Sequence, residues 1–380
     1  MEIFIKTLKG LEEILKDEVE VIGGKNVAIE NRGVSCQGDT RFLYRANYEL
    51  RTALRVLLPK FHFLAHTERD FYRKAKKIDW SEILTPDMTF AVDAVCHSKV
   101  FRHSKFIGLR LKDAIVDQFK DATGTRPNVD VQKPDVLINL HITELKVIIS
   151  IDSSGDSLHK RGYRAGVHDA PINEVLAAGI LKMTQWKGEV PFIDPMCGSG
   201  TFLLEAAMLA SNTAPQKINR DLGFTRWKNF DSALFQEIIK AADQRELPLP
   251  TILGSDIDAK SVSLAQTAIR RLGWENQIQV SKTSFFKSEN TFEDGVLVFN
   301  PPYGERLNEA DIIDFYRQIG DQMKANYSGF SAWIISSNLP ALKHVGLKPS
   351  KKVELMNGAL PCKLHLYELY SGTKRVRESV

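Results

Sequence analysis

PFIDPMCGSGTFLLEAAML, the sequence of residues 191–209, contains three local patterns in immediate succession. Residues 191–193 form a short apolar run typical of a strand, Gly198 and Gly200 follow in a turn, and residues 202–209 have the apolar character of a buried helix. Glycine lets the backbone turn tightly and approach a ligand closely, and the N-terminus of a helix attracts negative charge. A strand, a glycine turn and a helix in this order predict a ligand-binding loop in a parallel α/β sheet.

The loop lacks the features of two common ligand sites. A phosphate loop ends in Gly-Lys-Ser/Thr, which is missing here, and a dinucleotide fingerprint has glycine where Leu203 stands. The next strand, residues 251–254, leads to Asp256, and a carboxylate at this place commonly binds ribose hydroxyls. Asp194 suits an amine, and Ile257 suits the face of an adenine. S-adenosylmethionine contains all of these groups, so we expect it as the cofactor.

The expected cofactor residues lie at the ends of these two strands. An empty glycine turn in a structural domain is the alternative for the loop alone, but the second carboxylate and the motif described next favour a functional site. Cys197 suits a small loop residue better than a nucleophile, because no partner histidine is evident. We assign to the cofactor Asp194, Pro195, Cys197, Gly198, Ser199, Gly200, Thr201, Asp256, Ile257 and Asp258.

A second motif, Asn300-Pro301-Pro302-Tyr303, follows the apolar run of residues 296–299. Two prolines end the hydrogen-bonding ladder of a strand and fix the backbone of the turn. The Asn300 side-chain oxygen and the Pro301 carbonyl can together accept both protons of a planar amine, and Tyr303 offers an aromatic face for stacking. We therefore assign these four residues to catalysis on the exocyclic amine of a nucleobase.

The chain before the glycine loop divides into two regions and a linker. Residues 1–60 read as strand, helix, strand and helix, and the last helix runs from Phe42 to Leu58 and is closed by Pro59. The spacing of apolar residues in the second region predicts helices and strands at 71–78, 89–95, 107–119, 136–142 and 146–151. Residues 153–170, rich in glycine, serine and charge, form the linker.

Composition limits the class of protein. A chain of 380 residues is expected to form two or three domains. The four cysteines are widely spaced and the histidines show no ligand spacing, so we expect no metal. The sequence shows no membrane span of about 18 apolar residues and no signal peptide, so we expect a cytoplasmic location. Residues 51–170 carry five more basic than acidic residues, which suits a polyanionic partner or an ordinary solvated surface equally well.

The stretch between the two carboxylate-bearing strands contains an insertion. Asp256 follows Asp194 by 62 positions (256 minus 194), far more than one crossover helix needs. Mixed basic and aromatic residues in this insertion suit contact with a nucleic acid. They equally suit a small helical lid packed on its own aromatic side chains. The insertion covers Asn212–Arg245 and contains Arg220, Arg226, Trp227, Lys228 and Phe230.

The motifs at residues 194–201, 254–258 and 300–306 resemble those of the Rossmann-fold RNA guanine-N2 methyltransferases. Residues 158–164, LHKRGYR, and the two strands before them resemble the end of a THUMP RNA-binding domain joined to such a catalytic domain. The resemblance covers the whole chain and is strongest to the bacterial 23S ribosomal RNA enzymes without a fused second methyltransferase domain. It implies an α/β protein with ferredoxin-like and THUMP α+β domains at residues 1–60 and 61–158, and a doubly wound Rossmann-fold methyltransferase domain at residues 159–380.

The resemblance also implies further site residues. In these enzymes an acidic or amide residue often follows the third strand and binds the adenine amine. Here no carboxylate follows the strand at residues 278–280, so Ser284 with its neighbour Phe285 is the candidate. RNA phosphates are expected to meet basic residues of the THUMP half and the linker, although each is as well explained as an exposed charge. The candidates are Arg102, Lys105, Lys160, Arg161 and Arg164.

The activity expected from the resemblance is methyl transfer from S-adenosylmethionine to the N2 amine of a guanine, in 23S ribosomal RNA. Three alternatives stay open: guanine-N2 methylation of transfer RNA, adenine-N6 methylation of DNA, and an inactive RNA-binding assembly factor. The tetrapeptide at residues 300–303 recognises an amine and not the ring behind it, so it does not separate guanine from adenine. The THUMP-like half favours RNA over DNA, and the intact tetrapeptide favours an enzyme.

Overall fold

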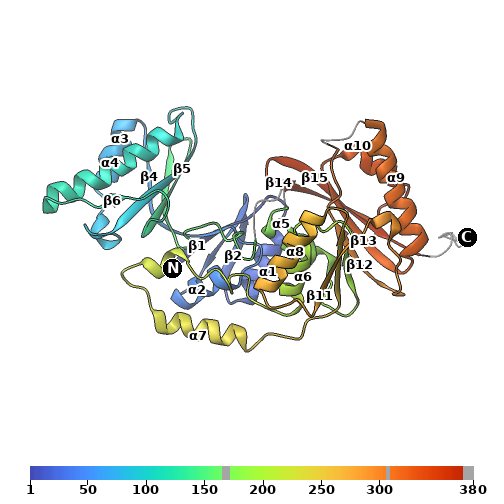
Figure 1. Ribbon diagram of the computed structural model, residues 1–380. Coiled ribbons are helices and arrows are strands. Elements are labelled where there is room, and N and C mark those ends of the chain that lie inside the picture. The colour runs from blue at the N-terminus through green and yellow to red at the C-terminus, as the bar shows by residue number, and fades with distance from the viewer. Residues whose placement is uncertain (165–171, 305–308, 371–380) are drawn as a thin grey trace, which may run out of the picture. The chain divides into compact units, whose positions relative to one another are not determined.

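The computed structural model describes residues 1–164, 172–304 and 309–370. The chain forms two compact units and passes from one to the other several times along its length (Figure 1). The first unit consists of Met1–Thr7, Leu15–Lys160 and Asn219–Ala241, and the second of the described residues of Leu8–Ile14, Arg161–Ile218 and Ala242–Val380. None of the helices in the described ranges is both long and apolar enough to cross a membrane.

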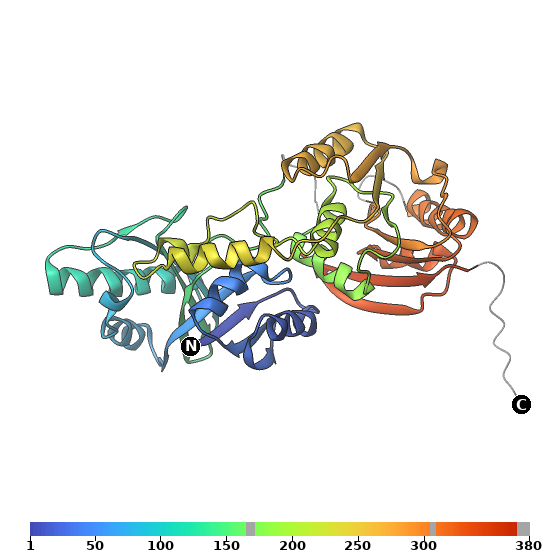
Figure 2. The same cartoon turned by 90° about the horizontal axis from the view of Figure 1, so that it is seen from below.

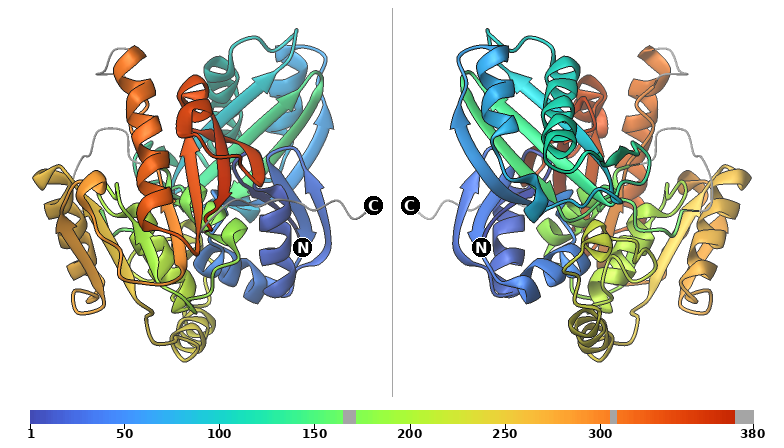
Figure 3. Two further views of the ribbon diagram at one scale, coloured as in Figure 1. Left: turned by 90° about the vertical axis from the view of Figure 1, so that its right-hand side faces the viewer. Right: turned by 90° about the vertical axis from the view of Figure 1, so that its left-hand side faces the viewer.

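An eight-stranded sheet runs through the first unit in the order β2-β3-β1-β4-β8-β7-β5-β6. Strand β4 pairs antiparallel with both β1 and β8, so a single sheet contains strands from the first 60 residues and from the region that follows. Helices α3 (Glu68–Lys76) and α4 (Ser104–Thr123) lie on one face of the β5 side of this sheet, as Figures 1 and 3 show. The strands are β1 (Glu2–Lys6), β2 (Lys25–Glu30), β3 (Gly33–Gln37), β4 (Arg55–Leu64), β5 (Thr89–His97), β6 (Asn128–Val129), β7 (Val136–Thr143) and β8 (Lys146–Asp152).

The helix expected from Phe42 to Leu58 is wrong in its second half. Helix α2 covers Thr40–Glu49, and the chain then enters strand β4. Pro59 lies inside β4 at a register shift opposite β8, where an irregular ladder tolerates a residue without an N–H. Apolar spacing alone did not reveal this strand, because its pairing with β1 and β8 decides the local structure.

Much of the insertion, residues 219–241, belongs to the first unit and packs on α2. Figure 2 shows its helix α7 (Ser232–Asp243), in yellow, alongside the blue helices of the N-terminal region. The Tyr44 ring of α2 stacks on Phe224 with the ring centroids 4.2 Å apart, and Phe235 meets Tyr44 edge-on at 6.0 Å. The aromatic side chains of the insertion also pack on one another, as one of the two alternatives expected, with the ring centroids of Phe224 and Phe235 5.1 Å apart. The sequence did not predict their additional packing on Tyr44 of the N-terminal helix α2. We call residues 219–241 the strap.

The second unit contains a seven-stranded sheet in the order β11-β10-β9-β12-β13-β15-β14. The five strands from β11 to β13 are parallel, and β15 and β14 continue the sheet in antiparallel fashion. This confirms the doubly wound sheet, and β9, the middle one of the five parallel strands, has β10 on one side and β12 on the other. The strands are β9 (Phe192–Asp194), β10 (Ile252–Asp256), β11 (Ile278–Lys282), β12 (Gly295–Phe299), β13 (Phe330–Ser336), β14 (Lys351–Asn357) and β15 (Leu360–Glu368).

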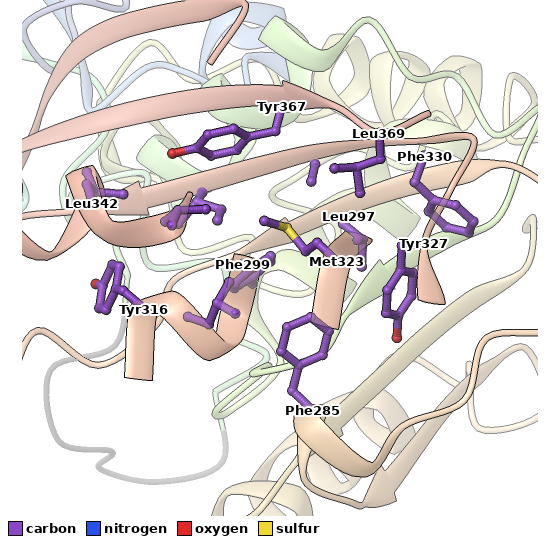
Figure 4. Packing of buried hydrophobic residues seen from close by; sticks show 14 of the residues in the cluster. Phe285, Leu297, Phe299, Tyr316, Met323, Tyr327, Phe330, Leu342, Tyr367 and Leu369 are labelled. Atoms are coloured by element: carbon purple, nitrogen blue, oxygen red, sulfur yellow. The ribbon is translucent and has the colours of Figure 1, made fainter. Parts of the chain in front are cut away.

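Helices connect the parallel strands, and one of them closes the apolar core next to the end of β12. Helix α9 (Glu309–Asn326) packs its buried Tyr316 and Met323 against Phe299 of β12, as Figure 4 shows. This packing fixes the backbone immediately before the Asn300–Tyr303 turn. The remaining helices of this unit are α5 (Glu174–Thr184), α6 (Thr201–Ala210), α8 (Ala259–Arg271), α10 (Leu339–Leu342) and the short helices η3 (Phe285–Lys287) and η4 (Lys343–Val345).

Candidate active site

A pocket of about 680 Å³ lies at the carboxyl ends of β9, β10 and β12. Ligands of open α/β sheets bind at such a place, where the strand order reverses. The pocket brings together all four expected catalytic residues, and every expected cofactor residue except Gly200 lines it. Its lining is Ile172, Asp194, Pro195, Met196, Cys197, Gly198, Ser199, Thr201, Phe202, Asp256, Ile257, Asp258, Lys260, Ser261, Ser284, Phe285, Phe286, Asn300, Pro301, Pro302, Tyr303, Gly304 and Phe315.

The glycine loop between β9 and α6 shapes one wall of this pocket. Gly198 and Gly200 have φ angles of +52° and +82°, which favour glycine over residues with a side chain. Gly200 is the N-cap of α6 and lies next to Ala265 of α8, so its role is in the turn and in packing. Leu203 takes the place of a third glycine because Gly254 on β10 makes room for it. A Cβ on Gly254 would lie 2.4 Å from Leu203 Cδ1.

Two carboxylates stand at the ends of neighbouring strands and face this loop. Asp256 accepts hydrogen bonds from the backbone N–H of Gly198 and of Asp258, both at 2.9 Å. Asp194 is 1% exposed and accepts from the N–H of Met196 at 3.1 Å. Burial raises the pKa of the Asp194 carboxyl well above its usual range, and the neighbouring Asp256 charge raises it further. A cationic group bound beside Asp194 would favour the ionised carboxylate and lower this pKa.

Two of the other expected cofactor residues have structural partners. Asp258 is the N-cap of α8 and accepts from the backbone N–H and the hydroxyl of Ser261, at 2.9 and 2.7 Å. Cys197 is buried, and desolvation raises the pKa of its thiol well above the usual value. A thiol held in its protonated form is a poor nucleophile, which agrees with a loop role for Cys197.

The Asn300–Tyr303 turn also lines the pocket and follows β12, the strand next to β9. The Tyr303 hydroxyl donates to Asn300 Oδ1 at 2.6 Å, so the asparagine side chain is already held in one orientation. The backbone carbonyls of Pro302 and Tyr303 accept from side chains behind the turn, at 3.3 and 2.8 Å. Glu305 and Arg306, which end the motif at residues 300–306, lie outside the described residues.

Comparison with known proteins places each part of the chain in a family. Residues 161–365 match the RMKL-like methyltransferase domain, residues 65–152 match the THUMP domain, and residues 2–57 match the RlmL ferredoxin-like domain. This chain belongs to the RMKL-like methyltransferase family. The match agrees with the resemblance read from the three motifs and with the Rossmann-type sheet of the second unit.

Relatives of this RMKL-like methyltransferase match nearly the whole chain. It is 39% identical over 371 residues, covering 97% of this chain and 96% of the relative, to the Synechocystis protein named "Putative RNA methyltransferase slr0064". It is 35% identical to "Ribosomal RNA large subunit methyltransferase K/L" of Syntrophotalea carbinolica, covering 97% of this chain but only 54% of that protein. A solved structure named SMU.472, "a putative methyltransferase complexed with SAH", has a TM-score of 0.88 at 29% identity, covering 98% of this chain and 99% of that chain.

Sequence reasoning missed three aromatic residues that line the pocket of this RMKL-like methyltransferase, Phe202, Phe286 and Phe315. Phe286 and Phe315 meet edge-on with their ring centroids 5.2 Å apart. Ile257 also lines the pocket and is 71% exposed, so its side chain is available for contact with a flat ligand. Phe286 follows the candidates Ser284 and Phe285 directly, so position suggested it. Phe315 comes from α9, and only the folding of that helix onto the sheet brings it to the site.

The expected RNA contacts of this RMKL-like methyltransferase divide into exposed and structural residues. Arg102, Lys105 and Lys160 are exposed, and Lys160 pairs with Asp156 at 3.1 Å on the surface. Arg161 is a correction, because its side chain is fully buried against Glu205 and has no face to offer a phosphate. Arg164 is partly buried and pairs with Glu174, which anchors this part of the linker to α5. In the linker, residues 165–170 lie outside the described ranges.

Proposed function

We propose that this protein transfers a methyl group from S-adenosylmethionine to the N2 amine of a guanine in RNA, and that the RNA is 23S ribosomal RNA. The observation that carries the proposal is one pocket that joins the glycine loop and Asp256 to the Asn300–Tyr303 turn. The loop side suits a methyl donor, and the turn side suits the amine that receives the methyl group.

The residues on the loop side fit S-adenosylmethionine group by group. Asp194 is a buried carboxyl suited to the ammonium group, and the N-terminus of α6 suits the carboxylate. Asp256 suits the ribose hydroxyls, while Ile257 and Phe286 provide apolar surface for the adenine. When bound, this cofactor supplies an electrophilic methyl group on a sulfonium centre. Ser284 also lines this side of the pocket and stays our candidate for the adenine amine.

The turn side orients the base. An exocyclic guanine amine is a poor nucleophile, since its lone pair is delocalised into the ring. Asn300 Oδ1 has a second lone pair beside the one used by Tyr303, so it and the Pro301 carbonyl can accept the two amine protons. Holding both protons aims the nitrogen lone pair at the methyl group, and correct placement supplies much of the rate. The ring of Tyr303 supports the base by stacking.

The RNA-binding half supplies the affinity that the pocket lacks. Extracting a base from a helix costs a few kcal/mol, and stacking on one aromatic ring returns about 1–3 kcal/mol. Because these terms nearly cancel, contacts to phosphates must supply the net binding. Arg102, Lys105 and Lys160, all exposed, are the proposed contacts. The family match at residues 65–152 supports the assignment of Arg102 and Lys105.

We propose that the domains cover residues 1–60, 61–158 and 159–380, with the strap belonging by packing to the first unit. The family matches at residues 2–57, 65–152 and 161–365 support this division.

Nucleoside mass spectrometry on a deletion strain tests the proposed function. We expect N2-methylguanosine to decrease in 23S ribosomal RNA and to return when the wild-type gene, but not Asn300→Ala, is supplied. Loss confined to transfer RNA, or loss of N6-methyladenine from DNA, would replace the proposed substrate by the corresponding alternative. An unchanged nucleoside profile would leave the assembly factor as the better explanation.

A further inference from the structure

Three side chains behind the Asn300–Tyr303 turn form a polar network with its backbone. They are Tyr316 on α9, Ser336 at the end of β13, and Asn338, which precedes α10. None of the three lines the pocket. They therefore reach the reacting groups only through the turn, and any effect on catalysis has to pass through its backbone.

Tyr316 is anchored from both sides. Its ring is fully buried in the apolar cluster shown in Figure 4. Its hydroxyl lies 2.6 Å from Ser336 Oγ and donates to the Pro302 carbonyl at 3.3 Å. A buried hydroxyl that loses its partners is costly, so these contacts fix the direction of the phenol. A rigid aromatic side chain thus holds one carbonyl of the turn.

Asn338 performs two tasks with one side chain. Its Oδ1 accepts from the Ala341 N–H at 3.0 Å and caps α10. Its Nδ2 donates to the Tyr303 carbonyl at 2.8 Å. Its own backbone N–H donates to Ser336 Oγ at 3.0 Å, which joins it to Tyr316. The amide is suited to this place because it carries an acceptor for the helix and a donor for the turn.

Tyr316 and Asn338 donate hydrogen bonds to two consecutive peptide units of the turn. Proline already fixes φ at positions 301 and 302, so the remaining freedom of the turn lies mainly in the peptide units that follow. Those units carry the Pro302 and Tyr303 carbonyls, and both are held. We propose that Tyr316 and Asn338 are positioning residues, which set the Pro301 carbonyl and the Asn300 side chain for a planar amine. This inference rests on the proposed function and names residues that the motif at 300–303 does not contain.

Two substitutions separate positioning from general stability. Asn338→Ser keeps an N-cap residue as good as asparagine but is too short to reach the Tyr303 carbonyl. Tyr316→Phe keeps the ring in the core and removes only the hydroxyl. The matched controls are Asn290→Ser, which removes an amide donor to the carbonyls of Phe292 and Asn326, and Tyr327→Phe, which removes a hydroxyl bonded to Ser288 in the same apolar cluster.

The measurements are kcat and KM for methyl transfer to RNA isolated from the deletion strain, the affinity for S-adenosylmethionine, and Tm. We expect kcat to fall about 10- to 100-fold in Asn338→Ser and Tyr316→Phe, as small misplacements of reacting groups do. We expect cofactor affinity within about twofold of wild type, and Tm close to that of the matched control. Turnover equal to the controls in both variants, or a loss of cofactor affinity that accounts for the whole effect, would overturn the positioning role.

A failure of the proposed function can be distinguished from a failure of the positioning role. If the wild-type enzyme methylates a nucleoside other than guanosine, the ratio of variant to control turnover still measures positioning. If it methylates none, hydrogen exchange at the amides of Tyr303 and Gly304 decides the matter. Faster exchange in the two variants than in the controls supports the positioning role of Tyr316 and Asn338, and unchanged exchange rejects it.

Discussion

The oxygen of the Asn300 side chain accepts from the Tyr303 hydroxyl and retains a second lone pair toward the pocket. This single bond orients the amide before any base arrives. An asparagine that had to find its orientation during the reaction would lose part of the advantage of a prepared site. The sequence shows that Asn300 carries a hydrogen-bond acceptor, whereas its orientation comes from the hydrogen bond with Tyr303.

Replacing Asn300 by alanine removes one of the two proposed amine acceptors. We expect methyl transfer to fall by at least about 100-fold, a loss of the size found when one transition-state hydrogen bond is removed. Affinity for S-adenosylmethionine should stay near normal, because Asn300 is assigned to the amine that receives the methyl group and not to the cofactor. Single-turnover methylation and cofactor titration measure the two effects. Retained turnover in Asn300→Ala would contradict the two-acceptor mechanism.

Asp194 is expected to show opposite effects on stability and on binding. Burial raises its pKa in the folded protein above the value in the unfolded chain. Between these two values the folded state binds more protons, so the free energy of unfolding decreases as the pH rises. Asp194→Asn should therefore make the free protein more stable at neutral pH, and the gain should shrink as the pH falls toward about 4. Urea unfolding of wild type and variant at several pH values measures this difference in the free energy of unfolding.

The same substitution should weaken cofactor binding. An ionised Asp194 bonded to the ammonium group is a charge-assisted contact of about 1.5–3 kcal/mol, so Asp194→Asn is expected to lower affinity about 10- to 100-fold. Wild-type affinity should also rise with pH, since binding favours the ionised carboxyl, while the variant should lack this dependence. Equal pH dependence in both proteins would remove Asp194 from the ammonium site.

At the scale of elements, the strap shows how a segment inserted in one unit becomes part of another. Residues 219–241 lie between α6 and β10 in the sequence, yet Phe224, Phe230 and Phe235 pack around Tyr44 of α2. Polar contacts reinforce this packing, since Arg41 and Glu237 form a bidentate pair at 3.0 and 2.9 Å. That pair is exposed and adds little, so the aromatic contacts hold the strap.

Substitution of Phe235 by alanine tests the strap. Its side chain is 3% exposed, and its removal should lower the free energy of unfolding by about 3–5 kcal/mol. The control Gln236→Ala changes an exposed neighbour on the same helix and should have little effect. Affinity for S-adenosylmethionine should not change in either variant, because every residue of the pocket belongs to the second unit. Chemical denaturation measures the loss of stability, and cofactor titration measures the affinity. An unfolding curve for Phe235→Ala equal to that of wild type would show that the packing of the strap does not stabilise the protein.

At the scale of the whole molecule, the units do not correspond to contiguous pieces of chain. A fragment of residues 161–380 would carry the strap without the helix on which it packs. We expect this fragment to expose Phe224, Phe230 and Phe235 and to aggregate. With residues 219–241 replaced by a short Gly/Ser linker, the fragment should aggregate less and bind S-adenosylmethionine. Both fragments lack Leu8–Ile14 of the second unit, so their comparison isolates the strap. Light scattering and cofactor titration compare the two fragments, and equal aggregation of both would contradict the assignment of the strap to the first unit.

The sequence alone determined the class of fold and the two sides of the pocket. Short motifs could do this because the strand ends of a parallel sheet meet at one edge, so the glycine loop, Asp256 and the Asn300–Tyr303 turn converge without knowledge of the rest. Local patterns failed where a distant partner decides the structure. The strand at residues 55–64 depends on β1 and β8, the burial of Arg161 depends on Glu205, and the strap depends on α2.

Tertiary structure alone also decided how the turn is held. Tyr316, Ser336 and Asn338 carry no motif, and nothing in the sequence distinguishes them from other residues of their types. They contact the turn only because α9 and the end of β13 pack behind residues 300–303. A reacting group can be recognised from its own chemistry, whereas the groups that position it are defined by distance, and distance is set by the folded chain.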